Sequence, residues 1–309
     1  MFVLVLWLSL FHVTHIPMDR LGLHRDTGIT MYKTPRGYLL NSATEGTAVL
    51  FSPSGRVVGR YDRQGSGPGE FHRQFVLAVD EVGIHFCSNG RFIVSFDHGL
   101  HLIPPSLPPL PPQSNLNAFL GLSGDGGSIL VSLAGREHLF AELQYTGKQW
   151  VIPRRFLPTG TGNTLDNKHF LQTGKRALVH HRTVFSARMG IGRDEDAYEI
   201  EVFDHFLGGV HSQEASLTLA AEVEGFPATA GVKALIYGAV RTPSGYIVEL
   251  FSHVRAGGLY HRWQDHFNGE GVFLKRVNMD GTRLLPVVNG PEVFVVQDTG
   301  ESYGLKRLY

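Results

Sequence analysis

Short apolar runs, each followed by a tight turn, recur along the chain. In the first such group, Gly37 and Gly55 close two hairpin turns, and glycine suits the positive φ angles that such turns require. Short runs bounded by Gly, Pro, Asp and Ser are typical of β-strands rather than helices. We therefore expect a four-stranded antiparallel unit with strands at residues 29–33, 38–42, 47–51 and 56–61.

The grouping repeats along the rest of the sequence. A propeller blade needs about 40–50 residues, so about six blades fit into the 309 residues of the chain. We expect an all-β fold, a six-bladed β-propeller of four-stranded antiparallel blades that forms one domain over residues 1–309. In the fifth unit, Val254–Gly271 is expected to be a long loop excursion. The later units are expected at residues 76–103, 118–156, 170–216, 232–288 and 292–309.

The sixth unit ends before a fourth strand, and the N-terminus offers a replacement. Residues Phe2–Phe11 are apolar but too short for a membrane-spanning helix. They lack the basic start and the cleavage site of a signal peptide, and the first charged residue is Asp19. We expect residues 2–10 to pair as a strand with the last blade, residues 290–309, because closing the ring removes exposed sheet edges. The alternatives are a remnant of an export signal or a missing upstream one.

One connector carries a specific signature. Residues 65–71 read GSGPGEF, and LAVDEVGIHF and RFIVSFDHGLHLI follow. This order of glycine-rich hinge, inner strand and second hairpin resembles the repeat of the NHL family, and resembles still more the bacterial six-bladed β-propellers. The similarity covers residues 46–104 and returns in 271–309. It implies a propeller fold and a periplasmic or extracellular location. The chain departs from the pattern at Cys87–Asn89, where Asp is usual, and by lacking a proline shortly after the hinge.

Charge and cysteine content narrow the function classes. Lys plus Arg and Asp plus Glu each number 28, so the formal net charge is zero. A nucleic-acid-binding protein more often has a basic excess or a basic stripe, and this sequence has neither. Cys87 is a single cysteine, so no disulfide can form within the chain. We expect no nucleic-acid partner, no transmembrane segment and a monomer.

The connections between strands predict where a binding surface would lie. Within each unit the first and third connections are tight, whereas the second connection and the one to the next unit are longer. In a propeller these two sets emerge on opposite faces, and loops held by a rigid scaffold commonly carry function. The strongest candidate is Tyr260–His266, which gathers aromatic, basic and acidic groups; the alternative is that Trp263 covers the core. The candidate binding residues are His72, Arg73, Arg136, His138, His169, Arg193, His261, Arg262, Trp263 and His266.

No established catalytic or metal motif appears. The 16 histidines form no HExxH pattern, and there is no Cys-x-x-Cys. The segment Gly121–Gly124 is followed by Asp125, so the G-x-S-x-G nucleophile turn is incomplete. We expect no cofactor and a non-catalytic propeller that presents a loop-rich face to a protein, peptide or glycan. The alternative is a metal-dependent lyase or lactone hydrolase, with Ca or Zn held in the central channel by residues of separate blades.

Overall fold

The protein is described from a computed structural model. Its strands are joined by turns and loops, with one 3-10 helix, η1 (Met18–Leu21), among the described residues. No helix in this part of the chain has the length and the apolar character needed to cross a membrane. The structure describes residues 15–24, 28–42, 45–63, 65, 70, 76–79, 83–88, 92–103, 116–122, 128–133, 138–158, 175–181, 183–188, 190–203, 215–224, 226, 232–256, 259–279, 281–300 and 302–308.

The described strands group into six antiparallel sheets, three of which come from the first half of the chain. Sheet 1 consists of β2 (Ile29–Thr34), β3 (Gly37–Ser42), β4 (Thr47–Phe51) and β5 (Val57–Tyr61). Sheet 2 consists of β6 (Val76–Val79), β7 (Ile84–Ser88), β8 (Phe92–Phe96) and β9 (Leu102–Ile103). Sheet 3 consists of β10 (Leu116–Leu122), β11 (Ser128–Leu133), β12 (His138–Tyr145) and β13 (Trp150–Pro158).

The second half of the chain forms the other three sheets. Sheet 4 consists of β14 (Lys175–His180), β15 (Thr183–Arg188), β17 (Ala197–Phe203) and β18 (Leu217–Glu222). Sheet 5 consists of β16 (Gly190–Gly192), β19 (Val232–Thr242), β20 (Gly245–Ala256), β21 (Leu259–Asn268) and β22 (Phe273–Asn278). Sheet 6 consists of β23 (Thr282–Pro286), β24 (Val293–Asp298), β25 (Tyr303–Arg307) and β1 (His15–Pro17).

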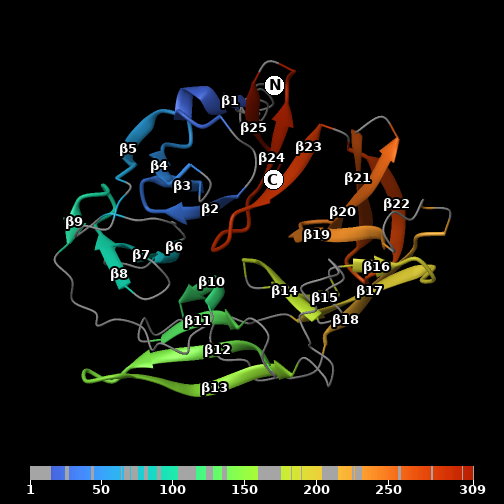
Figure 1. Ribbon diagram of the computed structural model, residues 1–309, viewed down its shortest axis with the longest axis horizontal. Coiled ribbons are helices and arrows are strands. Elements are labelled where there is room, and N and C mark those ends of the chain that lie inside the picture. The colour runs from blue at the N-terminus through green and yellow to red at the C-terminus, as the bar shows by residue number, and fades with distance from the viewer. Residues whose placement is uncertain are drawn as a thin grey trace, which may run out of the picture.

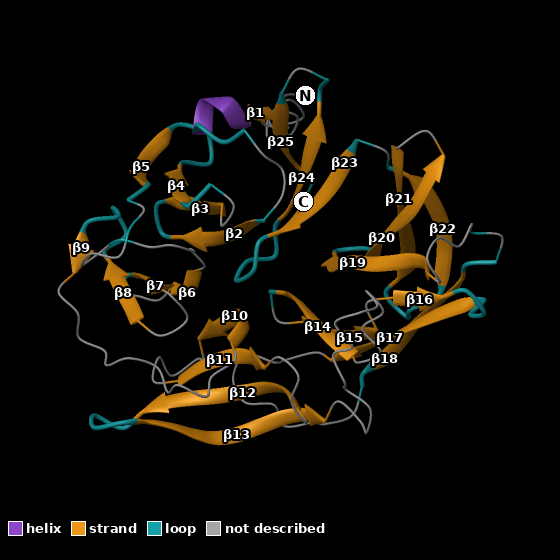
Figure 2. Cartoon of the chain, viewed as in Figure 1, coloured by secondary structure: helices purple, strands orange, loops and turns teal. Residues whose placement is uncertain are grey.

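The sheets are arranged around the middle of the molecule in a propeller-like manner (Figure 1). The strands β2, β6, β10, β14, β19 and β23 lie nearest to the middle, and the later strands of each sheet lie farther out. Figure 2 shows the same arrangement with strands dominating every sector. The expected all-β fold of antiparallel sheets is confirmed.

The hairpins of sheet 1 agree with the sequence pattern. Thr34 pairs with Gly37 at the end of the β2–β3 hairpin, and Gly37 has a φ angle of 139°. Gly55 has a φ angle of 82° in the β4–β5 turn. A side chain is strained at such angles, so glycine at these two positions fixes where the chain reverses.

The packed cores lie between neighbouring sheets. Sheets 4 and 5 share a cluster that includes Phe185 and Leu250, both fully buried. Sheets 1 and 2 share a cluster that includes Leu50 and Phe86. Because alternate side chains of a strand point to opposite faces, one sheet can contribute to two such clusters, as sheet 5 does. Ile247 of β20, for example, packs with β23 and β24 of sheet 6 rather than with sheet 4.

Sheet 6 combines both ends of the described chain. Strand β1 pairs antiparallel with β25, with His15 opposite Lys306 and Pro17 opposite Gly304. Ile16, which is 3% exposed, packs in a core cluster shared by sheets 6 and 1. The expected strand at residues 2–10 lies outside the described residues, so β1 is the N-terminal segment that the structure places on this sheet.

The fifth unit differs from the expectation. Val254–Gly271 is not a loop excursion, because β20 and β21 form one long hairpin that pairs from Gly245↔Asn268 to Ala256↔Leu259. Strand β22 pairs with β21, and β23 begins sheet 6 instead of ending the fifth unit. The sequence pattern failed here because β21 carries several polar residues that are buried or partly buried, such as Gln264 and Asp265, and polar residues are more typical of loops.

Candidate functional site

Of the six candidate binding residues that the structure describes, five lie on strands and one lies in a turn. Arg193 is exposed in the turn between β16 and β17, as expected for a loop residue. His138 is the first residue of strand β12. The remaining candidates His261, Arg262, Trp263 and His266 lie on strand β21, so their assignment to a long loop was wrong. Outside the described residues are His72, Arg73, Arg136 and His169.

Trp263 lies against the core of sheets 4 and 5. It is partly buried, and its ring centroid lies 4.4 Å from that of Phe226 and 5.8 Å from that of His261. This packing supports the alternative interpretation, in which Trp263 covers the core.

A buried ionic network on β21 joins sheets 4 and 5. Asp265 is fully buried, and Arg276 of β22 donates to both of its carboxylate oxygens at 2.6 Å. The Tyr198 hydroxyl of β17 donates to Asp265 Oδ2 at 2.7 Å. Arg276 also donates to the Glu222 carbonyl at 2.9 Å. Every oxygen of the carboxylate is therefore satisfied, which is the condition for a buried charge to be tolerated.

A second buried carboxyl lies between sheets 5 and 6. Glu249 of β20 is 1% exposed, its Oε1 accepts the Leu284 N–H at 3.2 Å, and Arg262 Nη1 lies 3.6 Å from that oxygen. Burial raises the pKa of Glu249 to about 7, although Arg262, the Leu284 N–H and Arg283 oppose the rise. Among the described residues, Glu249 Oε2 has no hydrogen-bond partner.

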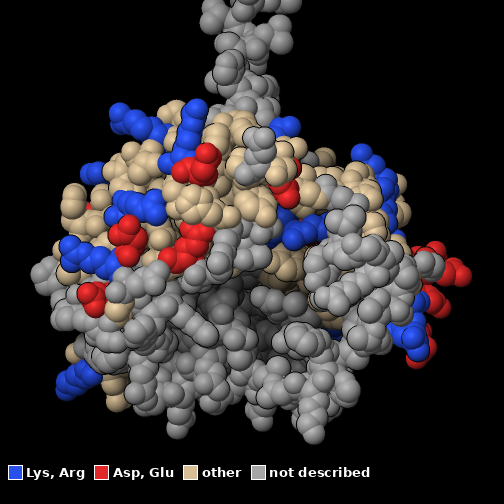
Figure 3. Space-filling view, turned by 45° about the horizontal axis from the view of Figure 1, so that its top comes forward, with Lys and Arg blue, Asp and Glu red and all other residues tan. Residues whose placement is uncertain are grey.

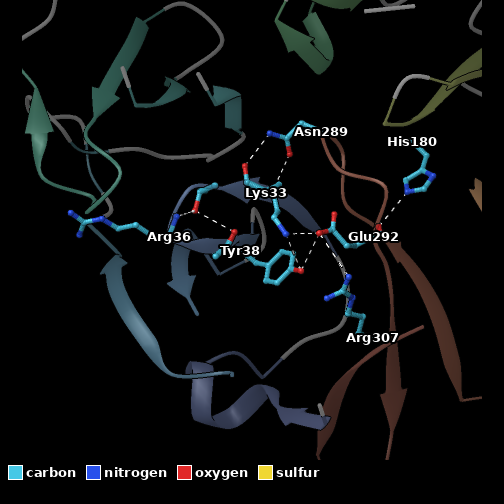
Figure 4. A network of polar contacts seen from close by, with 9 residues as sticks. Lys33, Arg36, Tyr38, His180, Asn289, Glu292 and Arg307 are labelled. Carbon is cyan, nitrogen blue, oxygen red and sulfur yellow. Dashed lines mark hydrogen bonds and ion pairs between the residues drawn. The ribbon is translucent and has the colours of Figure 1, made fainter. Parts of the chain in front are cut away.

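A polar network joins sheets 1, 4 and 6 through the β23–β24 connection (Figure 4). Glu292 accepts from the Lys33 ammonium and, at 3.3 Å, from the Tyr38 hydroxyl; Arg307 Nη2 lies 4.0 Å away. Asn289 and the backbone of Lys33 exchange two hydrogen bonds, at 2.6 and 3.0 Å. The connection also pairs with β2 through a parallel bridge between Met31 and Val287.

Burial and pairing set the charge states of this network. Burial opposes ionisation of Glu292, but hydrogen bonding and attraction to Lys33 outweigh it and lower the pKa of Glu292. Burial also opposes the charge of Lys33, yet Glu292 and Tyr38 raise its pKa overall. Both groups are therefore charged at neutral pH and bind each other, which favours a structural rather than a catalytic role.

His180 of β14 attaches sheet 4 to the same region. Its Nδ1 accepts the Arg241 N–H at 3.1 Å, and its Nε2 lies 3.3 Å from the Glu292 carbonyl oxygen. Nε2 is therefore the protonated nitrogen, because a carbonyl only accepts. Burial lowers the pKa of His180 to about 4, so the imidazole is neutral at physiological pH and both of its nitrogens are occupied.

A pocket of about 350 Å³ lies at the junction of sheets 6 and 1, between η1 and the β24–β25 turn. The turn is the second connection of sheet 6, and η1 lies on the connection from sheet 6 to sheet 1. In an alternating antiparallel sheet these two connections emerge on the same side. The pocket therefore lies on the side for which we expected the longer loops. Its lining residues are Asp19, Leu23, His24, Asp298, Gly300, Ser302 and Tyr303.

Sequence reasoning did not select the residues of the network or the pocket. Lys33 and Glu292 are 259 residues apart, and no motif links them. The Asn289–Gly290 pair is a turn signal, but it does not reveal that Asn289 reaches β2. Within the described residues, no group of three His, Cys, Asp or Glu side chains is close enough to hold a metal ion.

The exposed charges on the described part of the surface are mixed in sign. Figure 3 shows Lys and Arg side chains next to Asp and Glu side chains. The described surface in this view carries no single-sign patch of the kind that attracts a polyanion.

Comparisons with known proteins bear on the fold alone. No family model matches the chain. No curated protein matches it either. Among solved structures, a member of the DUF4221 family from Bacteroides vulgatus is similar, with a TM-score of 0.57, 9% identity, and 95% of each chain covered. A protein described as exported, from Bacteroides fragilis, is similar with a TM-score of 0.58, 9% identity, and 96% of this chain and 94% of that chain covered.

Proposed function

We propose that the chain is a non-catalytic six-bladed propeller that presents its loop-rich face to a protein, peptide or glycan. Six described sheets and the pairing of β1 with β25 support a ring closed by an N-terminal segment. The likeness to two Bacteroides structures over nearly their whole length supports a single domain of this kind. The description of one of them as exported supports a location outside the cytoplasm.

The position of the pocket carries the proposal. It lies on the side of the second connections and of the connections between sheets, where we expect the scaffold to hold binding groups. The polar groups that meet in this network bind one another instead: Lys33 binds Glu292, and both nitrogens of His180 have hydrogen-bond partners. No specific observation favours the alternative of a metal-dependent lyase or lactone hydrolase.

A comparison of the two faces tests the proposal. The purified chain would be applied to glycan and peptide arrays and then compared with two charge reversals on the loop face, Asp298→Arg and Arg193→Glu. The matched control is Lys148→Glu, an exposed residue in the β12–β13 turn, which is a third connection and emerges on the opposite side. We expect a ligand whose binding falls at least about tenfold with a loop-face reversal and is unchanged by the control. An absence of ligands on both arrays, or equal loss in all three variants, would contradict the proposal.

A further inference from the structure

The pocket between η1 and the β24–β25 turn has two walls of different origin. Asp19, Leu23 and His24 come from η1 and the residues after it, whereas Asp298, Ser302 and Tyr303 come from the ends of the hairpin. Its volume of about 350 Å³ is near the lower end of the range of about 300–1,000 Å³ for small-molecule pockets. A pocket of this volume suits a small ligand.

Both walls are held rigidly by local hydrogen bonds. Asp298 Oδ1 accepts the Gly300 N–H at 2.8 Å, and Thr299 and Ser302 close the turn with a backbone bond of 2.9 Å. On the other wall, Gly22 caps η1 in the left-handed conformation, and its N–H donates to the Asp19 carbonyl at 2.8 Å. A site that is ordered before binding loses less conformational entropy when a ligand arrives.

The carboxylates that line the pocket form no ion pair with a described Lys or Arg. Among the described residues, neither Asp19 nor Asp298 takes part in an ion pair, and no Lys or Arg lines the pocket. Asp298 Oδ2 is left for a ligand, because Oδ1 already serves the turn. Ionised carboxylates are strong acceptors for hydroxyl donors.

The pocket also offers donors and an apolar surface. The His24 imidazole and the Ser302 hydroxyl are groups that can donate as well as accept. Leu23 is 1% exposed, and Tyr303 is partly buried against the core shared by sheets 6 and 1. The lining is thus an apolar base and an aromatic ring with polar groups around them.

The polar groups are spread around the pocket and do not converge. Asp19, His24 and Asp298 do not form a group of three side chains close enough to hold one metal ion, and the described residues contain no such group elsewhere. A compact cation therefore cannot engage all of them at once. A ligand that satisfies these groups needs several hydroxyls at separate positions and an apolar face.

We propose that this pocket binds a neutral saccharide. Its hydroxyls donate to the carboxylates of Asp19 and Asp298, a ring oxygen or hydroxyl accepts from His24 or Ser302, and its C–H face packs on Tyr303. This inference rests on the proposed function, because it names the ligand class of the loop-rich face.

The test uses the full chain and a panel of neutral mono- and disaccharides. Saturation-transfer NMR identifies binders, and isothermal titration calorimetry measures affinity for the wild type, Asp298→Asn, Asp19→Asn and Tyr303→Ala. The control is Asp194→Asn, an exposed aspartate in the turn between β16 and β17. We expect binding to fall at least about tenfold in each pocket variant, as for the loss of a charge-assisted hydrogen bond or an aromatic contact, and to be unchanged in the control.

Circular dichroism shows whether each variant folds. If either Asp298→Asn or Asp19→Asn fails to fold, the other variant still tests the inference. The inference is overturned if no saccharide gives saturation transfer, or if pocket and control variants bind equally. It is also overturned if lysine amide or arginine amide binds in an Asp298-dependent manner while no saccharide does. In these cases a peptide found on the peptide array, with binding sensitive to Asp298→Arg, would leave the proposed function intact and show that only the ligand class was wrong.

Discussion

Lys33 and Asn289 hold each other through a reciprocal pair of hydrogen bonds across 256 residues of sequence. The backbone N–H of Lys33 donates to Asn289 Oδ1 at 2.6 Å, and Asn289 Nδ2 donates to the backbone carbonyl of Lys33 at 3.0 Å. The Asn289 side chain thus pairs with the backbone of β2 at Lys33, as a neighbouring strand would. The pair fixes the β23–β24 connection of sheet 6 to the inner strand of sheet 1.

Asn289→Ala removes both hydrogen bonds and leaves the backbone groups of Lys33 without these partners. Because each net hydrogen bond contributes about 1 kcal/mol, we expect the free energy of unfolding to fall by about 2 kcal/mol. Urea denaturation followed by tryptophan fluorescence measures this change. Glu270→Ala is the control, since Glu270 is exposed in the β21–β22 turn. Equal stability of the two variants would show that the pair contributes little.

The network between sheets 4 and 5 predicts a graded loss of stability. Tyr198→Phe removes one hydrogen bond to Asp265 and should cost about 1–2 kcal/mol. Asp265→Ala should cost about 3–5 kcal/mol, because it leaves the Arg276 guanidinium partly buried without its carboxylate. Chemical denaturation of both variants gives the two values. If Tyr198→Phe cost as much as Asp265→Ala, the ion pair would not be the main contribution.

The raised pKa of Glu249 predicts a pH-dependent stability difference. Burial raises this pKa from 4.5 to about 7 in the folded state, so the group stabilises the fold in its protonated form. That contribution is complete below the unfolded pKa and is lost as pH rises to about 7. A shift of this size corresponds to about 3 kcal/mol as an upper limit.

Glu249→Gln keeps the shape but removes the titration. We expect the variant to gain stability relative to the wild type as pH rises from about 5 to 8, reaching at most about 3 kcal/mol. Thermal unfolding of both proteins across this pH range tests the prediction. Curves that remain parallel would mean that Glu249 does not titrate differently in the folded state.

The pairing of β1 with β25 predicts that the N-terminal strand stabilises the whole molecule. Ile16 is 3% exposed in the core shared by sheets 6 and 1, so Ile16→Ala should cost about 2–5 kcal/mol. Val57→Ala is the control, because Val57 is 41% exposed on β5. Urea denaturation measures both. A loss of less than about 1 kcal/mol for Ile16→Ala would argue against ring closure by this strand.

Most strands, their tight turns and the all-β class could be predicted from the sequence alone. Alternating apolar residues and glycines such as Gly37 and Gly55 act locally, so their effect can be read from neighbouring positions. The same local reading failed for β21, because Arg262, Gln264 and Asp265 are polar yet mostly buried. The buried charge of Asp265 is compensated by Arg276 and Tyr198 on other strands, which local patterns do not reveal.

Which polar groups contact one another could be seen only in the tertiary structure. Lys33 pairs with Glu292, and Asp19 shares a pocket with Asp298, because sheet 6 brings the two ends of the described chain together beside sheet 1. Charge interactions and pocket walls depend on distances in space, and neighbouring sheets place residues that are distant in sequence side by side. The candidate residues chosen from the sequence assumed loops, whereas the pairing of strands placed His261–His266 within a sheet.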